Sequence, residues 1–198
     1  IHKTDGWVVV LKGKHHHFGP GQDQGKPVQA WFQPANGVHN DVCSMEGECI
    51  VFAYNPGGAD FIPTDASYKE PAGTPKMRMT YQGEVKYTAL DPNAGDKGPL
   101  AWQFYGDPAK AEPTGRLLKL PGGFTPGPHT HASDAYVIGL GGSMHNFVPG
   151  SYDKGPSIGV AGMWFQPANG PHDNLCQSSG GCTIFIHNPG GADFIPIK

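Results

Sequence analysis

Two histidines stand two residues apart, at His129 and His131, after a stretch rich in glycine and proline. On a β-strand, alternation places both imidazoles on one face. A third histidine, His172, follows the turn sequence Pro-Ala-Asn-Gly-Pro. Three neutral imidazoles that converge suit zinc, iron, copper, nickel or manganese, and they leave positions for water or a substrate. The sequence therefore predicts a transition-metal site built from these three histidines.

Two further residues are candidates for catalysis, Asp134 and His145. Asp134 follows His131 by three residues, so its carboxylate could reach the metal, orient a histidine or face solvent. Either side chain could assist proton transfer. The sequence contains no Ser-His-Asp arrangement, phosphate-binding loop or nucleotide fingerprint, so any chemistry is expected to depend on the metal.

The four cysteines form two pairs that each enclose five residues. This spacing favours local disulfides across the base of a hairpin, Cys43–Cys49 and Cys176–Cys182. The alternative is a zinc knot, in which the thiolates would join His39 or His172. Disulfides would indicate an oxidising compartment, and we therefore predict a periplasmic or secreted location.

The elements that position these residues occur twice. The block Trp-Phe-Gln-Pro-Ala-Asn-Gly stands at 31–37 and again at 164–170, and Asn-Pro-Gly-Gly-Ala-Asp-Phe-Ile-Pro stands at 55–63 and 188–196. The offset that separates the two copies of each block also separates the two cysteine pairs, and it matches His39 to His172. Self-similarity of this kind predicts two copies of one domain. The repeated Trp, Gln and Asn of the first block, and the Asp of the second, are expected to serve packing and turn hydrogen bonds.

The first copy is incomplete at its N-terminus under this alignment. His2 matches His131 and Asp5 matches Asp134, whereas the counterpart of His129 falls before Ile1. We expect that the natural chain is longer or is processed before Ile1. A weaker metal site, with His2 and His39 as ligands, is predicted in this copy.

A run of three histidines, His15 to His17, follows in the first copy. Strand alternation splits the three between two faces, and we expect surface exposure for the run. His16 aligns with His145, so these two side chains could line equivalent pockets.

Composition predicts an all-β protein. The 198 residues include 30 glycines and 20 prolines, which interrupt helices but suit short strands joined by tight turns. The net charge of -3 and the scattered basic residues argue against a nucleic-acid partner. No apolar run approaches the roughly 20 residues of a membrane-spanning helix, and no membrane partner is expected.

The histidine motifs resemble those of the cupin family. Gly123, five residues and His-x-His, followed later by Pro-x-x-Gly-x-His ending at His172, are similar to the two cupin motifs. The resemblance implies tandem duplicated cupin barrels of the double-stranded β-helix or jelly-roll type. The implied domains are a truncated repeat at 1–65, a linker at 66–75 and a C-terminal domain at 76–198.

The resemblance also implies the chemistry. His129, His131 and His172 would hold one divalent transition metal, which could be Fe, Mn, Zn, Cu or Ni. The family usually supplies a glutamate where this sequence has Ala135 and Tyr136. The implied protein acts on or binds a small organic molecule, for example as a metal-dependent dioxygenase. Alternatives are a non-catalytic module that binds or stores a small ligand or metal, and a metal-dependent isomerase or hydrolase. Association into a homo-oligomer is a further expectation.

Overall fold

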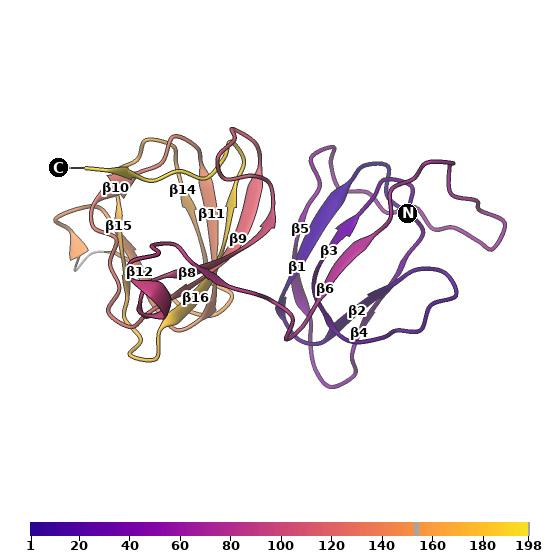
Figure 1. Cartoon of the computed structure of the whole chain (residues 1–198), viewed down its shortest axis with the longest axis horizontal. Coiled ribbons are helices and arrows are strands. Elements are labelled where there is room, and N and C mark those ends of the chain that lie inside the picture. The colour runs from indigo at the N-terminus through magenta and orange to yellow at the C-terminus, as the bar shows by residue number, and fades with distance from the viewer. Residues whose placement is uncertain (153–154, 198) are drawn as a thin grey trace. The chain divides into compact units, whose positions relative to one another are not determined.

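The computed structural model describes residues 1–152 and 155–197 (Figure 1). Residue contacts divide the chain into two compact units, Ile1–Val85 (unit 1) and Lys86–Lys198 (unit 2). Apart from a short 3₁₀ turn at Gly95–Lys97, the regular elements of the described residues are strands. The prediction of an all-β protein is confirmed. In the described part of the chain, no helix has the length and apolar character needed to cross a membrane.

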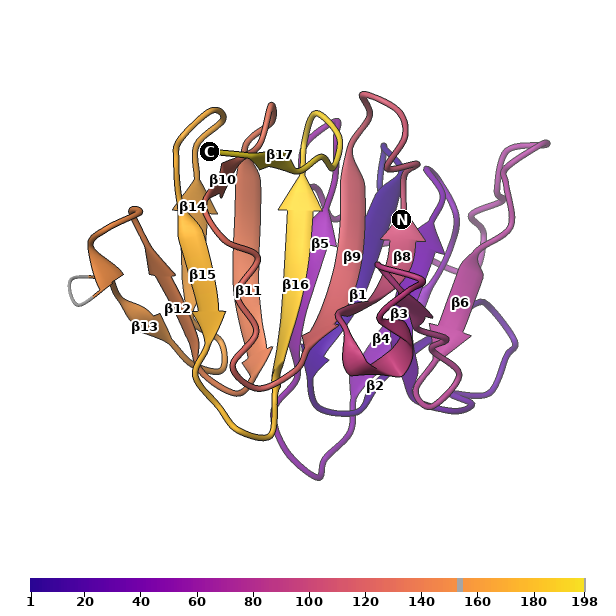
Figure 2. The ribbon, with the colours of Figure 1, turned by 60° about the vertical axis from the view of Figure 1, so that its left-hand side comes forward.

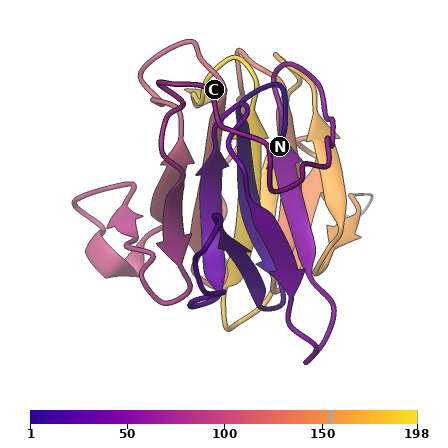
Figure 3. The ribbon, with the colours of Figure 1, turned by 90° about the vertical axis from the view of Figure 1, so that its right-hand side faces the viewer.

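Unit 1 is a twisted antiparallel sheet, drawn in indigo to magenta in Figure 3. Its core consists of Val8, Val10, Val28 and Trp31, with Met79 and Tyr81 packed against them. The sheet runs in the order β4-β2-β3-β1-β5, and β6 also pairs with β3. The strands are β1 (Gly6–Lys12), β2 (His15–Phe18), β3 (Val28–Gln33), β4 (Asn40–Cys43), β5 (Ile50–Tyr54) and β6 (Arg78–Tyr81).

The predicted linker, 66–75, forms no strand, and it lies within unit 1. The Tyr68 hydroxyl donates to the Asn36 carbonyl at 3.1 Å, and the Val38 amide donates to the Glu70 carboxylate at 2.6 Å. The segment leads into β6, whose backbone satisfies the second edge of β3. For this reason the boundary between the units lies after Val85, later than the sequence placed it.

Unit 2 contains three sheets. A six-stranded sheet has the order β14-β11-β16-β9-β8-β7, a three-stranded sheet has the order β13-β12-β15, and β10 pairs with β17. Figure 2 shows β11, β16 and β9 side by side. The strands are β7 (Thr88–Ala89), β8 (Leu100–Tyr105), β9 (Thr114–Leu120), β10 (His129–Thr130), β11 (Ala135–Gly141), β12 (Met144–Phe147), β13 (Ser157–Ile158), β14 (Met163–Gln166), β15 (Asp173–Cys176), β16 (Cys182–Asn188) and β17 (Ile195–Pro196).

Alternation along these strands builds the core of unit 2. Every second residue of β9, β11 and β16 faces inward, because successive side chains leave opposite faces of a sheet. The buried cluster contains Ala101, Leu118, Leu120, Ala135, Val137, Met144, Cys176, Cys182 and Ile184. On β9, Arg116 stands two residues before Leu118 and faces the same side of the sheet. On β16, Asn188 continues the inward-facing positions beyond Ile184. The sheet therefore presents an apolar wall with polar side chains at one end.

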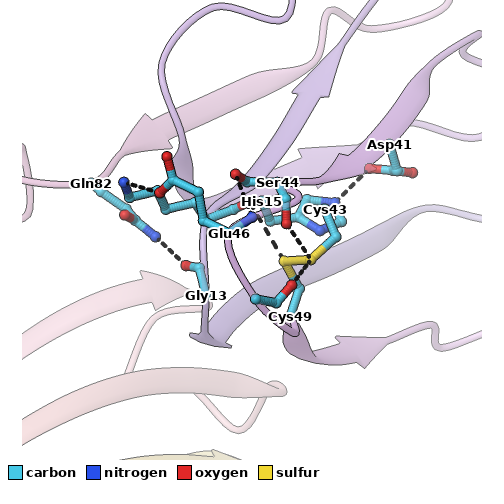
Figure 4. The surroundings of a disulfide bond; sticks show 10 residues. Gly13, His15, Asp41, Cys43, Ser44, Glu46, Cys49 and Gln82 are labelled. Carbon is cyan, nitrogen blue, oxygen red and sulfur yellow. Dashed lines mark hydrogen bonds and ion pairs between the residues drawn. A yellow bond between two sulfur atoms is a disulfide. The ribbon is translucent and has the colours of Figure 1, made fainter.

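Both predicted disulfides are present, and no described cysteine is free, so the zinc-knot alternative is wrong. Each joins Cα atoms 5.8 Å apart. Figure 4 shows the Cys43–Cys49 bond near Gly13, whose carbonyl accepts from Gln82. A Cβ on Gly13 would lie 3.0 Å from the Cys49 sulfur, and one on Gly142 would lie 3.0 Å from the Cys182 sulfur. Both glycines also have positive φ, so the same backbone turn accommodates each disulfide.

Candidate metal centre

Three histidines of unit 2 converge on one point. Their potential ligand atoms lie within 4.8 Å of one another. His129 lies on β10 and forms a backbone bridge with His172, with N···O distances of 2.9 and 3.0 Å in the two directions. His131 follows the strand, and its ring centroid lies 5.0 Å from that of His129 and 5.1 Å from that of His172. The three residues that the sequence predicted as ligands are therefore brought together.

Each ring is oriented by a backbone carbonyl. His129 Nδ1 lies 2.7 Å from the backbone carbonyl oxygen of Gly127. His131 Nδ1 lies 2.6 Å from the backbone carbonyl oxygen of Asp193. His172 Nδ1 lies 3.1 Å from the backbone carbonyl oxygen of Gly170. A carbonyl oxygen only accepts, so each Nδ1 carries the proton and donates it. Each Nε2 of the neutral ring then has a free lone pair, which is the arrangement found in metal-binding histidines.

Burial keeps these imidazoles neutral. It lowers the pKa of His129 and of His131, and it lowers the pKa of His172 to about 4. The carbonyl hydrogen bonds oppose this effect in all three residues but do not outweigh it. At neutral pH the donor atoms therefore need not lose a proton before they bind a cation.

The repeated Gln-Pro-Ala-Asn-Gly turn holds two of the ligands. Asn169 adopts a left-handed conformation with φ of 59°, and its amide donates to the His131 carbonyl at 2.7 Å. The Gly170 carbonyl accepts from both Gln166 Nε2, at 2.9 Å, and His172 Nδ1. The predicted turn role of this block is thus visible in its hydrogen bonds.

Asp134 contacts the turn, not the histidines. Its Oδ1 accepts from the Ala168 amide at 2.8 Å, and it does not line the cavity described below. Asp193 is the acid beside the cluster, with Oδ1 3.7 Å from His131 Nδ1 and Oδ2 accepting from the Ala132 amide at 2.8 Å. The carboxylates therefore support the site without entering the three-histidine group.

The cluster opens into a cavity of about 850 Å³. Its apolar wall includes Leu118, Leu120, Phe124, Val137, Met144, Trp164, Ile184 and Ile186, and its polar side chains include Arg116, Gln166, Asn174, Asn188 and Asp193. A largely apolar cavity with a few polar groups is typical of a small-molecule site. The arrangement can bind a cation and hold an organic molecule next to it.

His145 lies apart from this cavity. Its Nδ1 lies 2.9 Å from Gln177 Nε2, its Nε2 donates to the Gly155 carbonyl, and its ring packs against Tyr152. These contacts hold the imidazole on β12 among its own neighbours. A catalytic role for His145 remains a prediction, without a contact to the three histidines.

The first copy places His2 and His39 together, with ring centroids 5.0 Å apart. As in unit 2, His39 Nδ1 lies 3.1 Å from a glycine carbonyl, Gly37, and His2 Nδ1 donates to the Asp60 carbonyl. Burial lowers the pKa of His39. The pair is positioned like its counterparts, but the metal-binding group found among the described residues contains neither.

The expectation that His15 to His17 lie on the surface is wrong for His17, which is only 2 % exposed. His15 and His17 point inward and stack on Trp31, whereas His16 bonds the Gln24 carbonyl on the outer face. Alternation splits the run as predicted, but the inner face receives two histidines.

Asp41 is the partner of these two side chains. Its Oδ1 lies 3.0 Å from His15 Nε2 and 2.8 Å from His17 Nδ1, and its Oδ2 lies 3.5 Å from His39 Nε2. Burial opposes ionisation, but the hydrogen bonds from His15 and His17 outweigh it and hold the pKa of Asp41 well below its usual range. Asp41, Arg116 and the orienting role of Asp193 were not identified from the sequence. Strand alternation was the available signal for Asp41 and Arg116. The repeated Ala-Asp pair was the available signal for Asp193.

The comparisons with known proteins concern the fold. A family model described as "Domain of unknown function (DUF4437)" matches residues 79–187. No curated protein matches the sequence. Among solved structures, AerE from Microcystis aeruginosa is 12% identical, with 95% of this chain and 78% of that chain covered and a TM-score of 0.59.

Two further structures are similar. The protein Ylba from E. coli, of the DUF861 family, is 11% identical, covers 94% of this chain and 68% of its own, and has a TM-score of 0.58. The polyketide cyclase RemF from Streptomyces resistomycificus is 18% identical, covers 62% and 87%, and has a TM-score of 0.50. At these identities the likeness shows the fold alone, and that fold is cupin-like.

Proposed function

This chain belongs to the family described as a domain of unknown function (DUF4437), and we propose that its unit 2 is a divalent-metal centre that binds and transforms a small organic molecule. His129, His131 and His172 are the metal ligands in this proposal. The observation that carries it is the shared orientation of the three rings, in which each Nδ1 donates to a carbonyl and each Nε2 is left for a metal.

The donor set fits a first-row transition ion. Imidazole nitrogen suits zinc, copper, iron and nickel, and three protein ligands leave coordination positions open. A bound ion would supply Lewis acidity for isomerisation or hydrolysis, or, if it is iron, manganese or copper, the capacity to react with dioxygen. The protein's own residues hold the ligands, exclude water with the apolar wall and orient the organic molecule.

The cavity favours an enzyme over a storage module. A site that only stores metal needs no chamber beside it, whereas this cluster opens into about 850 Å³ of mostly apolar space. A dioxygenase is our first reaction class, because three neutral ligands leave room for both substrate and oxygen. The two disulfides suggest an oxidising environment, and we infer a periplasmic or secreted location from them.

Elemental analysis of protein purified without added metal or chelator tests this proposal. We expect about one equivalent of a transition metal in the wild type and almost none in a His129→Ala, His131→Ala double variant. His16→Ala is the matched control, because it removes an imidazole that lies on the outer face of unit 1.

The identity of the metal then separates the reaction classes. Iron, manganese or copper supports the oxygenase, and zinc supports a hydrolytic or isomerising centre. Metal that persists in the double variant, with the protein still folded by circular dichroism, would contradict the proposed ligands.

A further inference from the structure

A single arginine reaches the cavity from the sheet. Arg116 is on β9, where its partner residues are Ile186 on β16 and Gln103 on β8. Leu118 and Leu120 follow it at alternate positions and line the same cavity. Lys119, between them, is exposed on the opposite face. Alternation thus directs one cation inward from a strand whose inner row is otherwise apolar.

The guanidinium has no acceptor. Its Nε is buried without a hydrogen-bond partner, and among the described residues Arg116 forms no hydrogen bond and no ion pair within 4.0 Å. Burial lowers the pKa of Arg116, and the more distant charge of Asp193 opposes this. Arginine nevertheless stays charged in proteins, so the cavity contains a positive charge that lacks a protein partner.

Asp193 does not fill this role. One of its oxygens accepts from the Ala132 amide, and the other lies 3.7 Å from His131 Nδ1 without a hydrogen-bond partner. The charge of Asp193 acts on Arg116 from a distance, and among the described residues no hydrogen bond or ion pair joins the two side chains. An uncompensated buried charge destabilises a fold, so a residue of this kind is typical of a binding site.

We propose that Arg116 anchors the carboxylate of a small organic acid, which is the ligand class of this site. The planar guanidinium matches a carboxylate with two parallel hydrogen bonds. The hydrocarbon part of the acid packs against the apolar wall formed by Leu118, Val137 and Ile184. Because Arg116 and the histidines line one cavity, the acid lies beside the metal ligands. This inference rests on the proposed function, in that the cavity is taken as the binding site.

The test measures binding of small carboxylates and of their primary amides, which have nearly the same shape without the charge. Hexanoate, benzoate and phenylacetate are compared with their amides by calorimetry at millimolar concentration. We expect the wild type to prefer at least one acid over its amide by at least about tenfold, as a charge-assisted pair provides. In ¹⁵N spectra the Arg116 Nε–H resonance should shift with that acid and not with the amide.

Arg116→Gln should abolish the preference without lowering the melting temperature, because it removes an unpartnered buried charge. Arg116→Lys keeps the charge but loses the planar fork, and it should lose most of the preference. Lys119→Gln is the matched control, since it removes a charge from the same strand on the outer face, and it should bind like the wild type. Lys97→Gln tests the exposed lysine that also lines the cavity, and it should retain the preference.

The inference is overturned if the wild type shows no preference for any of the acids, or if Lys97→Gln loses the preference and Arg116→Gln keeps it. Repeating the titration with the His129→Ala, His131→Ala variant separates the two proposals. An Arg116-dependent preference that persists in this variant supports an organic-acid site that does not need the metal. The same preference in a wild-type protein that contains no metal supports the organic-acid site and rejects the metal-dependent function. Metal binding without the preference rejects the organic-acid site alone.

Discussion

Units 1 and 2 use the same turn for different purposes. In both, a glutamine amide donates to a glycine carbonyl at 2.9 Å, and the following histidine Nδ1 lies 3.1 Å from the same oxygen. In both, an aspartate accepts from an alanine amide of the turn at 2.8 Å. The framework that orients two imidazoles is therefore common to the units.

The surroundings of that framework differ. In unit 2 the third imidazole is His129, and Asn174 lies on β15 with its amide bonded to Asn146. In unit 1 the aligned positions hold Asp41 and His17, which form a carboxylate–imidazole pair. The comparison teaches that the repeated blocks specify the orientation of two rings, whereas residues outside the blocks decide whether a third imidazole or a carboxylate lies beside those rings.

The sharpest test compares equivalent histidines. His172→Ala should weaken metal binding by at least about 100-fold, since loss of a ligand costs more than the 10- to 100-fold typical of a lost supporting contact. His39→Ala should leave the metal content unchanged. Metal titration of the metal-free variants measures both. A reduced metal content in His39→Ala would show that unit 1 also holds metal.

Acid should destabilise unit 2 before unit 1. In metal-free protein, burial lowers the pKa of His129, His131, His172 and His187 below the 6.5 of the unfolded chain. The unfolded chain then binds protons that the folded unit does not, so stability falls as the pH falls from 6.5. For His172, with its pKa of about 4, the loss is on the order of 3 kcal/mol.

Unit 1 responds differently in the same window. His39 shifts in the same direction, but the depressed pKa of Asp41 contributes stability that is present above its ordinary value of 3.8 and is lost only below it. Amide hydrogen exchange at pH 6.5 and 4.5 distinguishes the two units. If the amides of unit 1 lost their protection from exchange before those of unit 2 as the pH falls, the predicted order of destabilisation would be wrong.

Asp41→Ala should destabilise unit 1 by about 2 kcal/mol, because Nδ1 of the fully buried His17 ring loses its acceptor. The effect is no larger because Asp41 is 38% exposed and water screens its charge. Denaturant unfolding measures the change. Asp23→Ala removes an exposed aspartate from the same unit and should be neutral; an equal effect of the two substitutions would show that the network adds no stability.

The last comparison between the two units concerns the disulfides. Cys43 is exposed, whereas Cys176 and Cys182 are only 0 % and 3 % exposed. Reductant should therefore open Cys43–Cys49 first, and each lost bond should cost on the order of 2 kcal/mol for so short a loop. Timed alkylation followed by peptide mass measurement gives the order. Simultaneous reduction would indicate that burial does not protect the second bond.

Much of the site could be predicted from the sequence because it depends on local chemistry. The His-x-His spacing, the Asn-Gly turn and the Cys-x5-Cys pairs each involve neighbouring residues, and the structure contains them as contacts. The all-β class followed from the frequency of glycine and proline. These features require no knowledge of which strands are neighbours.

Long-range pairing set the limit of prediction. Alternation separates Arg116 from Lys119 and His17 from His16, but it does not say which face is inside until the partner strands are known. Likewise, the pairing of β6 with β3 follows no local signal, and it joins residues after the expected linker to unit 1. Asp134 was a candidate ligand because of its spacing, yet the turn at Ala168 uses its carboxylate.

The carbonyl oxygens that orient the three ligand rings have a consequence for charge. They are neutral acceptors, unlike the carboxylates that often support metal-bound histidines. A divalent ion held only by neutral imidazoles would keep both of its charges, and it would lower the pKa of a bound water more than an ion that carries anionic ligands. In the proposed metal centre, the main chain would therefore contribute to the acidity of the bound water through the carbonyls that orient the ligands.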